Sequence, residues 1–199
     1  MSDLMTPVPQ RPSSLSLHGV RFVFLDRDGV INRKPPEREY IHHWDNFQFL
    51  PGAERAIAAL NRSGRRVIVV TNQRGIALGL YTGADVESLH TRLQQHLAQH
   101  GARIDAFYYC PHDKQQCDCR KPKPGLFQQA FRDFPGALPS NSLVIGDSIS
   151  DIQAARNLRI PVIFIEGDPN TRKSGSDEAA ALADAVSNSL AEAVDKYLN

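Results

Sequence analysis

Two aspartates, one residue apart, follow a short apolar segment near the start of the chain. Asp26 and Asp28 come directly after the apolar residues 22–25 and are followed by Gly29. A short, bounded apolar run predicts a buried strand, and Asp-Arg-Asp-Gly predicts the loop that leaves it. Two carboxylates held this close repel each other unless a cation lies between them or one is protonated. The pair therefore indicates either a Mg²⁺ site or an acid–base pair.

Polar residues also follow two later apolar runs. Thr71 and Asn72 follow residues 66–70, and Asp147 follows residues 142–145. If the three runs are parallel strands, their carboxyl ends open on the same edge of one sheet, where ligands bind in α/β folds. We therefore expect these groups to converge with the first two aspartates.

The converging groups match the needs of phosphoryl transfer. The three aspartates can supply hard oxygen ligands to Mg²⁺. Thr71 and Lys121 can donate hydrogen bonds to an anionic group bound against that metal, with Lys123 as the alternative lysine. Catalysis of phosphoryl transfer consists mostly of positioning and charge neutralisation, which these residue types provide.

A second constellation lies in a short cysteine-containing segment. It holds all three cysteines of the chain and one histidine: Cys110, His112, Cys117 and Cys119. An odd number of cysteines in one loop is poorly suited to disulfide bonding. Three thiolates and one imidazole supply the four ligands of a closed, tetrahedral Zn²⁺ site, and four protein ligands leave no open position for catalysis. We expect a structural zinc ion that shapes this loop and aims the following Arg120 and Lys121.

The elements that must position these groups alternate along the chain. We expect strands at 20–25, 66–70, 104–109, 142–145, 162–165 and 185–186, and helices at 53–61, 85–99, 124–134, 149–158 and 190–198. This alternation predicts an α/β fold with a doubly wound parallel sheet covered on both faces. Residues 33–46 are expected to form a flap over the site, and His90, on the second helix, is expected at the surface. There is no insertion large enough for a separate cap domain.

Composition narrows the classes of partner. The net charge is +1, with 23 basic and 22 acidic residues among 199. No field of one sign would draw in nucleic acid or an anionic membrane, so a small ligand is favoured. No apolar run approaches the roughly 20 residues that span a bilayer. We expect a tail over residues 1–19 without a signal peptide, one domain over residues 20–199, and a monomer in the cytoplasm.

Four ordered motifs together resemble those of the haloacid dehalogenase superfamily. They are Phe24-Leu-Asp-Arg-Asp-Gly-Val, Thr71-Asn-Gln, Arg120-Lys-Pro and Gly146-Asp-Ser-Ile-Ser-Asp151. The resemblance runs from about residue 21 to the C-terminus. It is strongest to small cap-less bacterial sugar-phosphate phosphatases of the histidinol-phosphatase-like subgroup, which carry the same zinc pattern before Arg-Lys-Pro. It implies a Rossmann-like sheet with a zinc-bound loop in place of a large cap.

The resemblance also implies roles for the motif residues. Asp26 would attack phosphorus and become an aspartyl phosphate. Asp28 would protonate the leaving oxygen and then deprotonate the hydrolytic water. Mg²⁺ would be held by Asp26, Asp147 and the backbone carbonyl of Asp28. Thr71 and Lys121 would hold the phosphoryl oxygens. Asp151 would either orient a metal-bound water or begin a helix. The residues expected to contact the substrate are Asn32, Tyr40, Asn72, Gln73, Arg74 and Arg120.

The substrate implied is a heptose 1,7-bisphosphate, from which the 7-phosphate would be removed in the route to nucleotide-activated heptose. Histidinol phosphate is the alternative within the same subgroup. A polynucleotide 3′-phosphatase is disfavoured because the balanced charge offers no surface that follows a phosphate backbone. A non-enzymatic phospho-acceptor or zinc-stabilised interaction module is the alternative from another class. Release of phosphate from a small phosphomonoester separates it from an enzyme.

Overall fold

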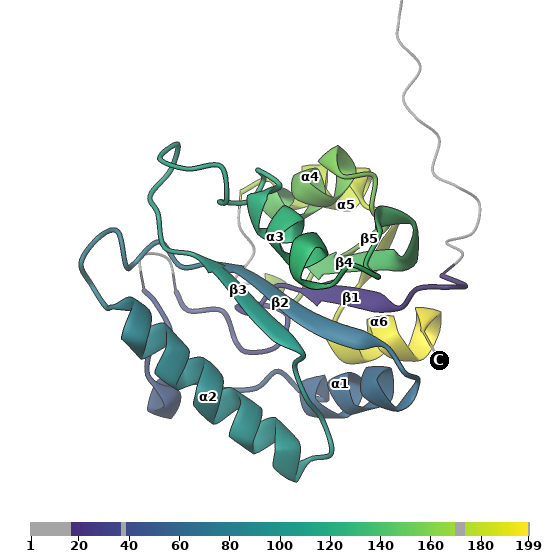
Figure 1. The fold of residues 1–199 in the computed structure, drawn as a ribbon, viewed down its shortest axis with the longest axis horizontal. Coiled ribbons are helices and arrows are strands. Elements are labelled where there is room, and N and C mark those ends of the chain that lie inside the picture. Colours follow the sequence, from purple (N-terminus) through teal and green to yellow (C-terminus); the bar gives the residue numbers. More distant parts are fainter. Residues whose placement is uncertain (1–16, 37–38, 170–173, 199) are drawn as a thin grey trace, which may run out of the picture.

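A computed structural model describes residues 17–36, 39–169 and 174–198. Most of the predicted tail lies outside these residues. Six parallel strands form one sheet in the order β3-β2-β1-β4-β5-β6 (Figure 1). The strands are β1 (Phe22–Leu25), β2 (Arg66–Asn72), β3 (Ala106–Cys110), β4 (Ser142–Gly146), β5 (Val162–Ile165) and β6 (Ala185–Ser187).

Helices cover both faces of the sheet, as the alternating pattern predicted. They are α1 (Ala53–Arg62), α2 (Gly83–Gln99), α3 (Gly125–Asp133), α4 (Ile149–Asn157), α5 (Ser176–Leu182) and α6 (Leu190–Tyr197), with short 3₁₀ turns η1 (Trp44–Asn46) and η2 (Pro139–Asn141). Val23 and Leu25 of β1 face a core shared with α1, α2 and α6. Phe22 and Phe24 face a second core shared with α3, α4 and α5 (Figure 1). Alternate side chains of the central strand therefore bury both faces.

Local sequence explains where several helices begin and end. Thr82 caps α2: its hydroxyl accepts a hydrogen bond from Asp85 N at 3.2 Å, and Asp85 Oδ2 accepts one from Thr82 N at 2.8 Å. This reciprocal pair satisfies two backbone donors that the first helical turn leaves open. After α1, Gly64 takes a left-handed φ of +80°, a conformation that glycine adopts without steric cost. Helix α2 therefore begins at Gly83, two residues before the predicted start, and α1 ends at Arg62, one residue after the predicted end.

Two boundaries differ from expectation. The first strand begins at Phe22 instead of residue 20, and Leu17, which we assigned to the tail, is buried in the core. Helix α5 was not predicted, because its sequence Ser-Asp-Glu-Ala-Ala-Ala-Leu buries only Ala179 and so carries no apolar period. Asp177 and Glu178 in its first turn favour the helix through its macrodipole. Among the helices of the described ranges, none combines the length and apolarity needed to cross a membrane.

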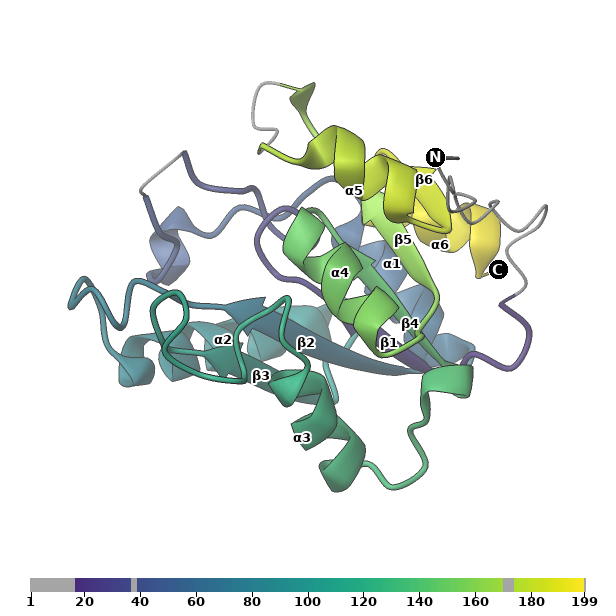
Figure 2. The same ribbon diagram turned by 90° about the horizontal axis from the view of Figure 1, so that it is seen from above.

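The strand order predicts a ligand-binding crevice at the centre of the sheet. From β1 the chain runs outward through β2 and β3, then returns to β4 on the other side of β1. Ligands of doubly wound sheets bind at such a reversal, beyond the carboxyl ends of the two central strands. The loops that follow β1, β2 and β3 gather at this end of the sheet (Figure 2). Asp26 and Asp147 flank the reversal, since they follow β1 and β4.

Candidate active site

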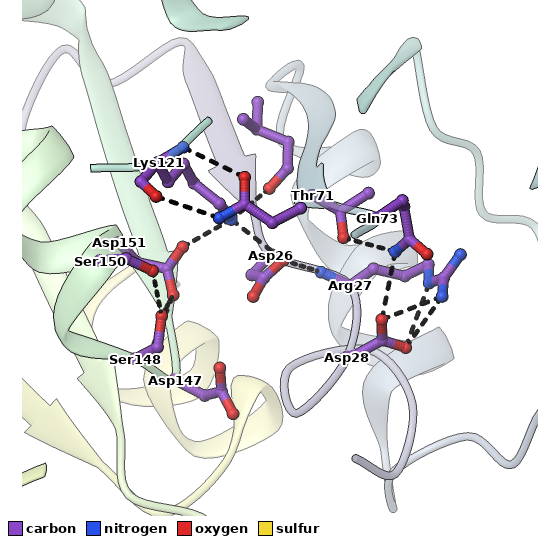
Figure 3. Close-up of polar contacts among 12 residues, drawn as sticks. Asp26, Arg27, Asp28, Thr71, Gln73, Lys121, Asp147, Ser148, Ser150 and Asp151 are labelled. Carbon is purple, nitrogen blue, oxygen red and sulfur yellow. Dashed lines mark hydrogen bonds and ion pairs between the residues drawn. The ribbon is translucent and has the colours of Figure 1, made fainter. Parts of the chain in front are cut away.

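Asp26 and Lys121 form the centre of the site (Figure 3). Lys121 Nζ lies 3.1 Å from Asp26 Oδ1 and 2.6 Å from Asp151 Oδ1, and donates to Val70 O at 2.6 Å. The lysine is only 4% exposed. Burial opposes its charge, but the carboxylates of Asp151 and Asp26 outweigh burial and raise the pKa of Lys121. Lys121 is therefore a fixed cation beside Asp26, whereas the alternative Lys123 is paired with the exposed Asp118 at 3.0 Å.

A cluster of carboxylates at the crevice fits a divalent cation. Asp26, Asp147 and Asp151 each offer an oxygen within 4.8 Å of the others. Both oxygens of Asp151 are engaged: Oδ1 pairs with Lys121, and Oδ2 accepts hydrogen bonds from Ser148 N at 3.1 Å and Ser148 Oγ at 2.5 Å. Asp151 thus caps α4, which favours the helix-start alternative. Asp26 and Asp147 are the pair better suited to Mg²⁺, whose preferred ligands are oxygens, although Asp147 Oδ2 also contacts Lys34.

Gly29 makes room for Asp147. A Cβ atom at Gly29 would lie 2.1 Å from Asp147 Oδ2, and the residue has a φ of +99°. Both the close approach and the backbone conformation require glycine at this position. The glycine of Asp-Arg-Asp-Gly therefore allows the loop after β1 to pack directly against the carboxylate that follows β4.

Asp28 turns away from Asp26 and is held by three neighbours (Figure 3). Arg27 donates to its carboxylate from Nε at 3.2 Å and from Nη2 at 2.9 Å. Asn32 Nδ2 donates to Oδ1 at 2.9 Å, and Gln73 Nε2 donates to Oδ2 at 3.3 Å. The Arg27 side chain points away from Asp26 and Asp147, is fully buried and orients the Asp28 carboxylate (Figure 3).

Asn32 and Gln73 are buried behind Asp28 instead of lining an open sugar pocket. Their exposed fractions are 0% and 2%. Gln73 Nε2 also donates to Thr71 Oγ1 at 2.9 Å, and Tyr81 Oη donates to Gln73 Oε1 at 2.8 Å. Because Thr71 Oγ1 accepts from the amide, its own hydroxyl hydrogen can be donated to an anion. These contacts correct our expectation for Asn32 and Gln73: they orient Asp28 and Thr71.

The cysteine loop has the dimensions of a tetrahedral zinc site. The three sulfurs lie 3.3–3.5 Å from one another, and His112 Nδ1 lies 3.3 Å from Cys119 Sγ and 3.7 Å from Cys110 Sγ. Ligands about 2.0–2.3 Å from a tetrahedral zinc ion are separated by roughly 3.5–3.8 Å. The predicted residues Cys110, His112, Cys117 and Cys119 are thus brought together, with their ligand atoms all within 4.8 Å of one another.

The cysteine loop is tied to Lys121 by hydrogen bonds that involve the backbone. Arg120 N donates to Cys117 Sγ at 3.4 Å, next to Lys121 in the chain. Asn72 Oδ1 accepts from Lys121 N at 3.1 Å, and Asn72 Nδ2 donates to Lys121 O at 3.2 Å. Asn72 therefore anchors the backbone of Lys121, where we had expected substrate contact. The loop and the end of β2 together fix where the lysine ammonium lies.

Comparison with known proteins identifies the family. Residues 16–159 match the model of a hydrolase family described as haloacid dehalogenase-like hydrolase. The chain belongs to this family. The resemblance stated from the four motifs and the predicted α/β fold are therefore confirmed.

Similar members of this hydrolase family act on heptose bisphosphates, according to their names. The D-glycero-alpha-D-manno-heptose-1,7-bisphosphate 7-phosphatase of Mycobacterium bovis is 42% identical over 171 residues, 85% of this chain and 87% of that protein. The D-glycero-beta-D-manno-heptose-1,7-bisphosphate 7-phosphatase of Vibrio cholerae is 39% identical over 184 residues, 88% and 95% of the two chains. The crystal structure of D,D-heptose 1,7-bisphosphate phosphatase from B. bronchiseptica, complexed with magnesium and phosphate, has 30% identity and a TM-score of 0.76, covering 89% and 97%.

Three predicted substrate residues of this hydrolase lie at the rim of the site. Arg74 pairs with Asp113 at 2.5 Å, next in the chain to His112 of the cysteine loop. Arg120 is half-buried, and its Nη1 donates to His112 O at 3.4 Å. Tyr40 reaches back from the flap to Tyr81, with 5.8 Å between ring centroids. All three side chains remain partly exposed, as a contact with a bound ligand requires.

Our expectation that His90 lies at the surface is wrong. The residue is 5% exposed, stacks on Phe107 with 4.4 Å between ring centroids, and has Nε2 3.4 Å from Arg27 Nη1. It belongs to the buried stripe of α2, next to Leu89 and four residues after Val86. That spacing was the available signal for its burial. His90 thus backs the arginine that orients Asp28.

The His90–Arg27 contact predicts a dependence of stability on pH. Burial and the charge of Arg27 lower the pKa of His90 from 6.5 to about 3. The unfolded chain therefore takes up a proton on His90 near pH 6.5, whereas the folded chain takes it up only near pH 3. Between these values the unfolded state binds more protons, so the free energy of unfolding is highest above pH 6.5 and decreases as the pH falls. Between pH 7 and 5 we expect the wild type to lose about 1–2 kcal/mol more than His90→Gln in urea unfolding. Equal slopes for His90→Gln and the wild type would contradict the assignment.

Lys34 is the charged residue of the site that the sequence did not reveal. Its ammonium forms an ion pair with Asp147 Oδ2, and its side chain is 9% exposed. The residue lies on the segment between β1 and η1, where no motif or period marks it. Its contact with a residue 113 positions away exists only in the folded chain.

Proposed function

We propose that this hydrolase is a Mg²⁺-dependent phosphatase that removes the 7-phosphate from D-glycero-D-manno-heptose 1,7-bisphosphate. The observation that carries the proposal is the contact of Asp26 with the buried Lys121 at the sheet's reversal, within reach of Asp147. The heptose bisphosphate phosphatases that cover most of the chain support the substrate class.

In this mechanism the Asp26 carboxylate attacks the phosphorus of the 7-phosphate. The bond from phosphorus to the sugar oxygen breaks, and an aspartyl phosphate forms. Lys121 and the Thr71 hydroxyl donate to the phosphoryl oxygens and offset the charge that develops there. Water then attacks the same phosphorus and releases inorganic phosphate and free Asp26. Dividing the displacement in two lowers the barrier of each step.

Asp28 is assigned the proton transfers. As a carboxylic acid it gives its proton to the leaving sugar oxygen, and as a carboxylate it accepts one from the attacking water. Its side chain is 21% exposed, so an oxygen of a bound ligand can reach it. Proton transfer requires the carboxyl group to exchange part of its contacts with Arg27, Asn32 and Gln73 for that oxygen. These neighbours hold the group between the two steps.

The metal assignments follow from the donor sets. Asp26, Asp147 and the backbone carbonyl of Asp28 would hold Mg²⁺, which supplies positive charge against the phosphate when bound. Cys110, His112, Cys117 and Cys119 would hold a structural Zn²⁺. The need for reduced thiols agrees with a cytoplasmic enzyme. We propose a monomer, because the large apolar side chains exposed among the described residues are Leu78, Leu80, Leu138 and Leu182, on three separate segments.

Arg120 and Arg74 are suited to the second phosphate of the substrate. Both guanidinium groups lie beside the zinc loop, and guanidinium matches phosphate geometry with two parallel donors. A sugar with a phosphate at each end could place one on Asp26 and the other at this rim. Recognition of the phosphate at the other end of the sugar would then depend on the loop that the zinc ion stabilises.

The proposal is tested by specificity constants for four compounds: the alpha and beta anomers of the heptose 1,7-bisphosphate, the heptose 7-phosphate and histidinol phosphate. We expect one bisphosphate anomer to exceed histidinol phosphate by at least about 100-fold, which is roughly the contribution of two charge-assisted hydrogen bonds. Arg120→Met should reduce kcat/KM for the bisphosphate much more than for the heptose 7-phosphate. Preference for histidinol phosphate would contradict the substrate, and release of no phosphate from any compound would contradict the enzyme.

A further inference from the structure

A lysine of the segment after β1 occupies an oxygen that the proposed metal needs. Lys34 Nζ contacts Asp147 Oδ2, and the two side chains are 9% and 6% exposed. Asp147 is one of the two carboxylates suited to Mg²⁺. A buried ammonium in contact with a proposed metal ligand requires an explanation, because two cations cannot share one oxygen at contact distance without strong repulsion.

The base of this segment is fixed, so the position of Lys34 is built into the fold. Arg33 N donates to Gln48 O at 2.7 Å, and Asn32 forms an antiparallel bridge with Phe49. The returning part of the segment is held at Ile41, whose carbonyl accepts from Arg27 Nη2 at 2.8 Å. The backbone is therefore tethered on both sides of Lys34, while its four-carbon side chain can still rotate.

The charges around the crevice are divided between two lysines. Lys121 Nζ pairs with Asp26 Oδ1 at 3.1 Å and with Asp151 Oδ1 at 2.6 Å. Lys34 forms an ion pair with Asp147, which lies on the side of the carboxylate cluster away from Lys121. A divalent cation bound to Asp147 takes over this neutralisation and repels the Lys34 ammonium. A phosphate bound against that cation would offer the displaced ammonium a new partner.

We infer that Lys34 competes with Mg²⁺ for Asp147 and, once displaced, binds the phosphate that sits against the metal. The inference rests on the proposed assignment of Mg²⁺ to Asp26 and Asp147. It makes Lys34 a residue of the substrate site that couples two binding events. Mg²⁺ frees the ammonium for phosphate, so each ligand raises the affinity for the other, and the coupling is reciprocal.

The coupling predicts opposite changes in two affinities. Lys34→Met removes the competitor of Mg²⁺ and a donor to phosphate. In isothermal titration calorimetry we expect Mg²⁺ alone to bind the variant about 3- to 10-fold more tightly, and inorganic phosphate to bind the Mg²⁺-saturated variant about 10-fold more weakly, as for loss of a partly desolvated ion pair. Lys34→Arg keeps the positive charge, so both constants should stay closer to those of the wild type.

Arg33→Met is the matched control. Arg33 is exposed and adjacent in the chain, so its replacement removes the same charge without removing the Asp147 contact. Both constants should stay within about twofold of the wild type, because exposed charges are screened. Thermal unfolding verifies that each variant is folded.

If folded Lys34→Met binds Mg²⁺ with unchanged or lower affinity, Lys34 does not compete with Mg²⁺ for Asp147. If its Mg²⁺-saturated form binds phosphate with unchanged affinity, Lys34 does not bind the phosphate. If Arg33→Met changes the affinities for Mg²⁺ and phosphate as much as Lys34→Met does, the changes come from the loss of one positive charge and the inference is overturned. These binding measurements involve no turnover. They can therefore contradict the role of Lys34 while the specificity constants support the proposed substrate, or support it while the specificity constants contradict the substrate.

Discussion

Replacing Asp26 with asparagine is expected to abolish phosphatase activity. An amide has nearly the same shape but cannot supply the carboxylate oxygen that bonds to phosphorus. For a nucleophile that forms a covalent intermediate, we expect kcat to fall by on the order of 10⁴-fold or more. The measurement is release of inorganic phosphate from the heptose bisphosphate at saturating substrate and Mg²⁺, together with trapping of the phosphoenzyme, which the variant should not form.

Asp118→Asn is a suitable control for Asp26→Asn. Asp118 has the same side chain, lies on the loop that precedes Lys121, and is 99% exposed in its pairing with Lys123. We expect its rate to stay within about twofold of the wild type, as for most surface substitutions. Asp26→Asn should still fold, because Lys121 keeps its contact with Asp151 and its hydrogen bond to Val70. A folded Asp26→Asn protein that turns over at the wild-type rate would exclude Asp26 as the nucleophile.

Replacing Cys119 with serine is expected to cost both zinc and activity. The neighbouring backbone is closely packed: a Cβ atom at Gly125, the first residue of α3, would lie 2.8 Å from Cys119 Cα. Loss of the ion releases the loop between β3 and α3, and Lys121 lies on its last part. We expect bound zinc to fall from about one per chain to none, the thermal midpoint to drop by several degrees, and kcat/KM to fall about 10- to 100-fold.

Metal analysis, thermal unfolding and kinetics at saturating Mg²⁺ measure these effects. Lys114→Ser changes an exposed residue of the same loop that supplies no ligand, and it should keep its zinc and its rate. Treating the wild type with a zinc-selective chelator should reproduce the Cys119→Ser phenotype, and excess Mg²⁺ should not reverse it. If Cys119→Ser retains zinc, or loses zinc without any loss of rate, the loop does not position Lys121 in the proposed way.

The sequence predicted the sheet well because each strand carries its own signal. The apolar runs before Asp26, Thr71 and Asp147 are short, bounded and buried on both faces, and each ends in polar residues. The cysteine loop was equally easy to predict as a metal site, since its four candidate ligands lie within ten residues of one another in the sequence. Helix α5 was missed because its alanines carry no apolar period and only Ala179 of the helix is buried.

The chain by itself therefore determined the parallel α/β fold, the family, and the main polar groups at the strand ends. Only the tertiary structure decided their partners: that Lys121 rather than Lys123 contacts Asp26, that His90 supports Arg27, and that Lys34 reaches Asp147. The physical reason is that period and spacing report neighbours along one segment. A buried charge or amide must find a partner from whichever segment packs against it, and that choice is made only when the segments meet.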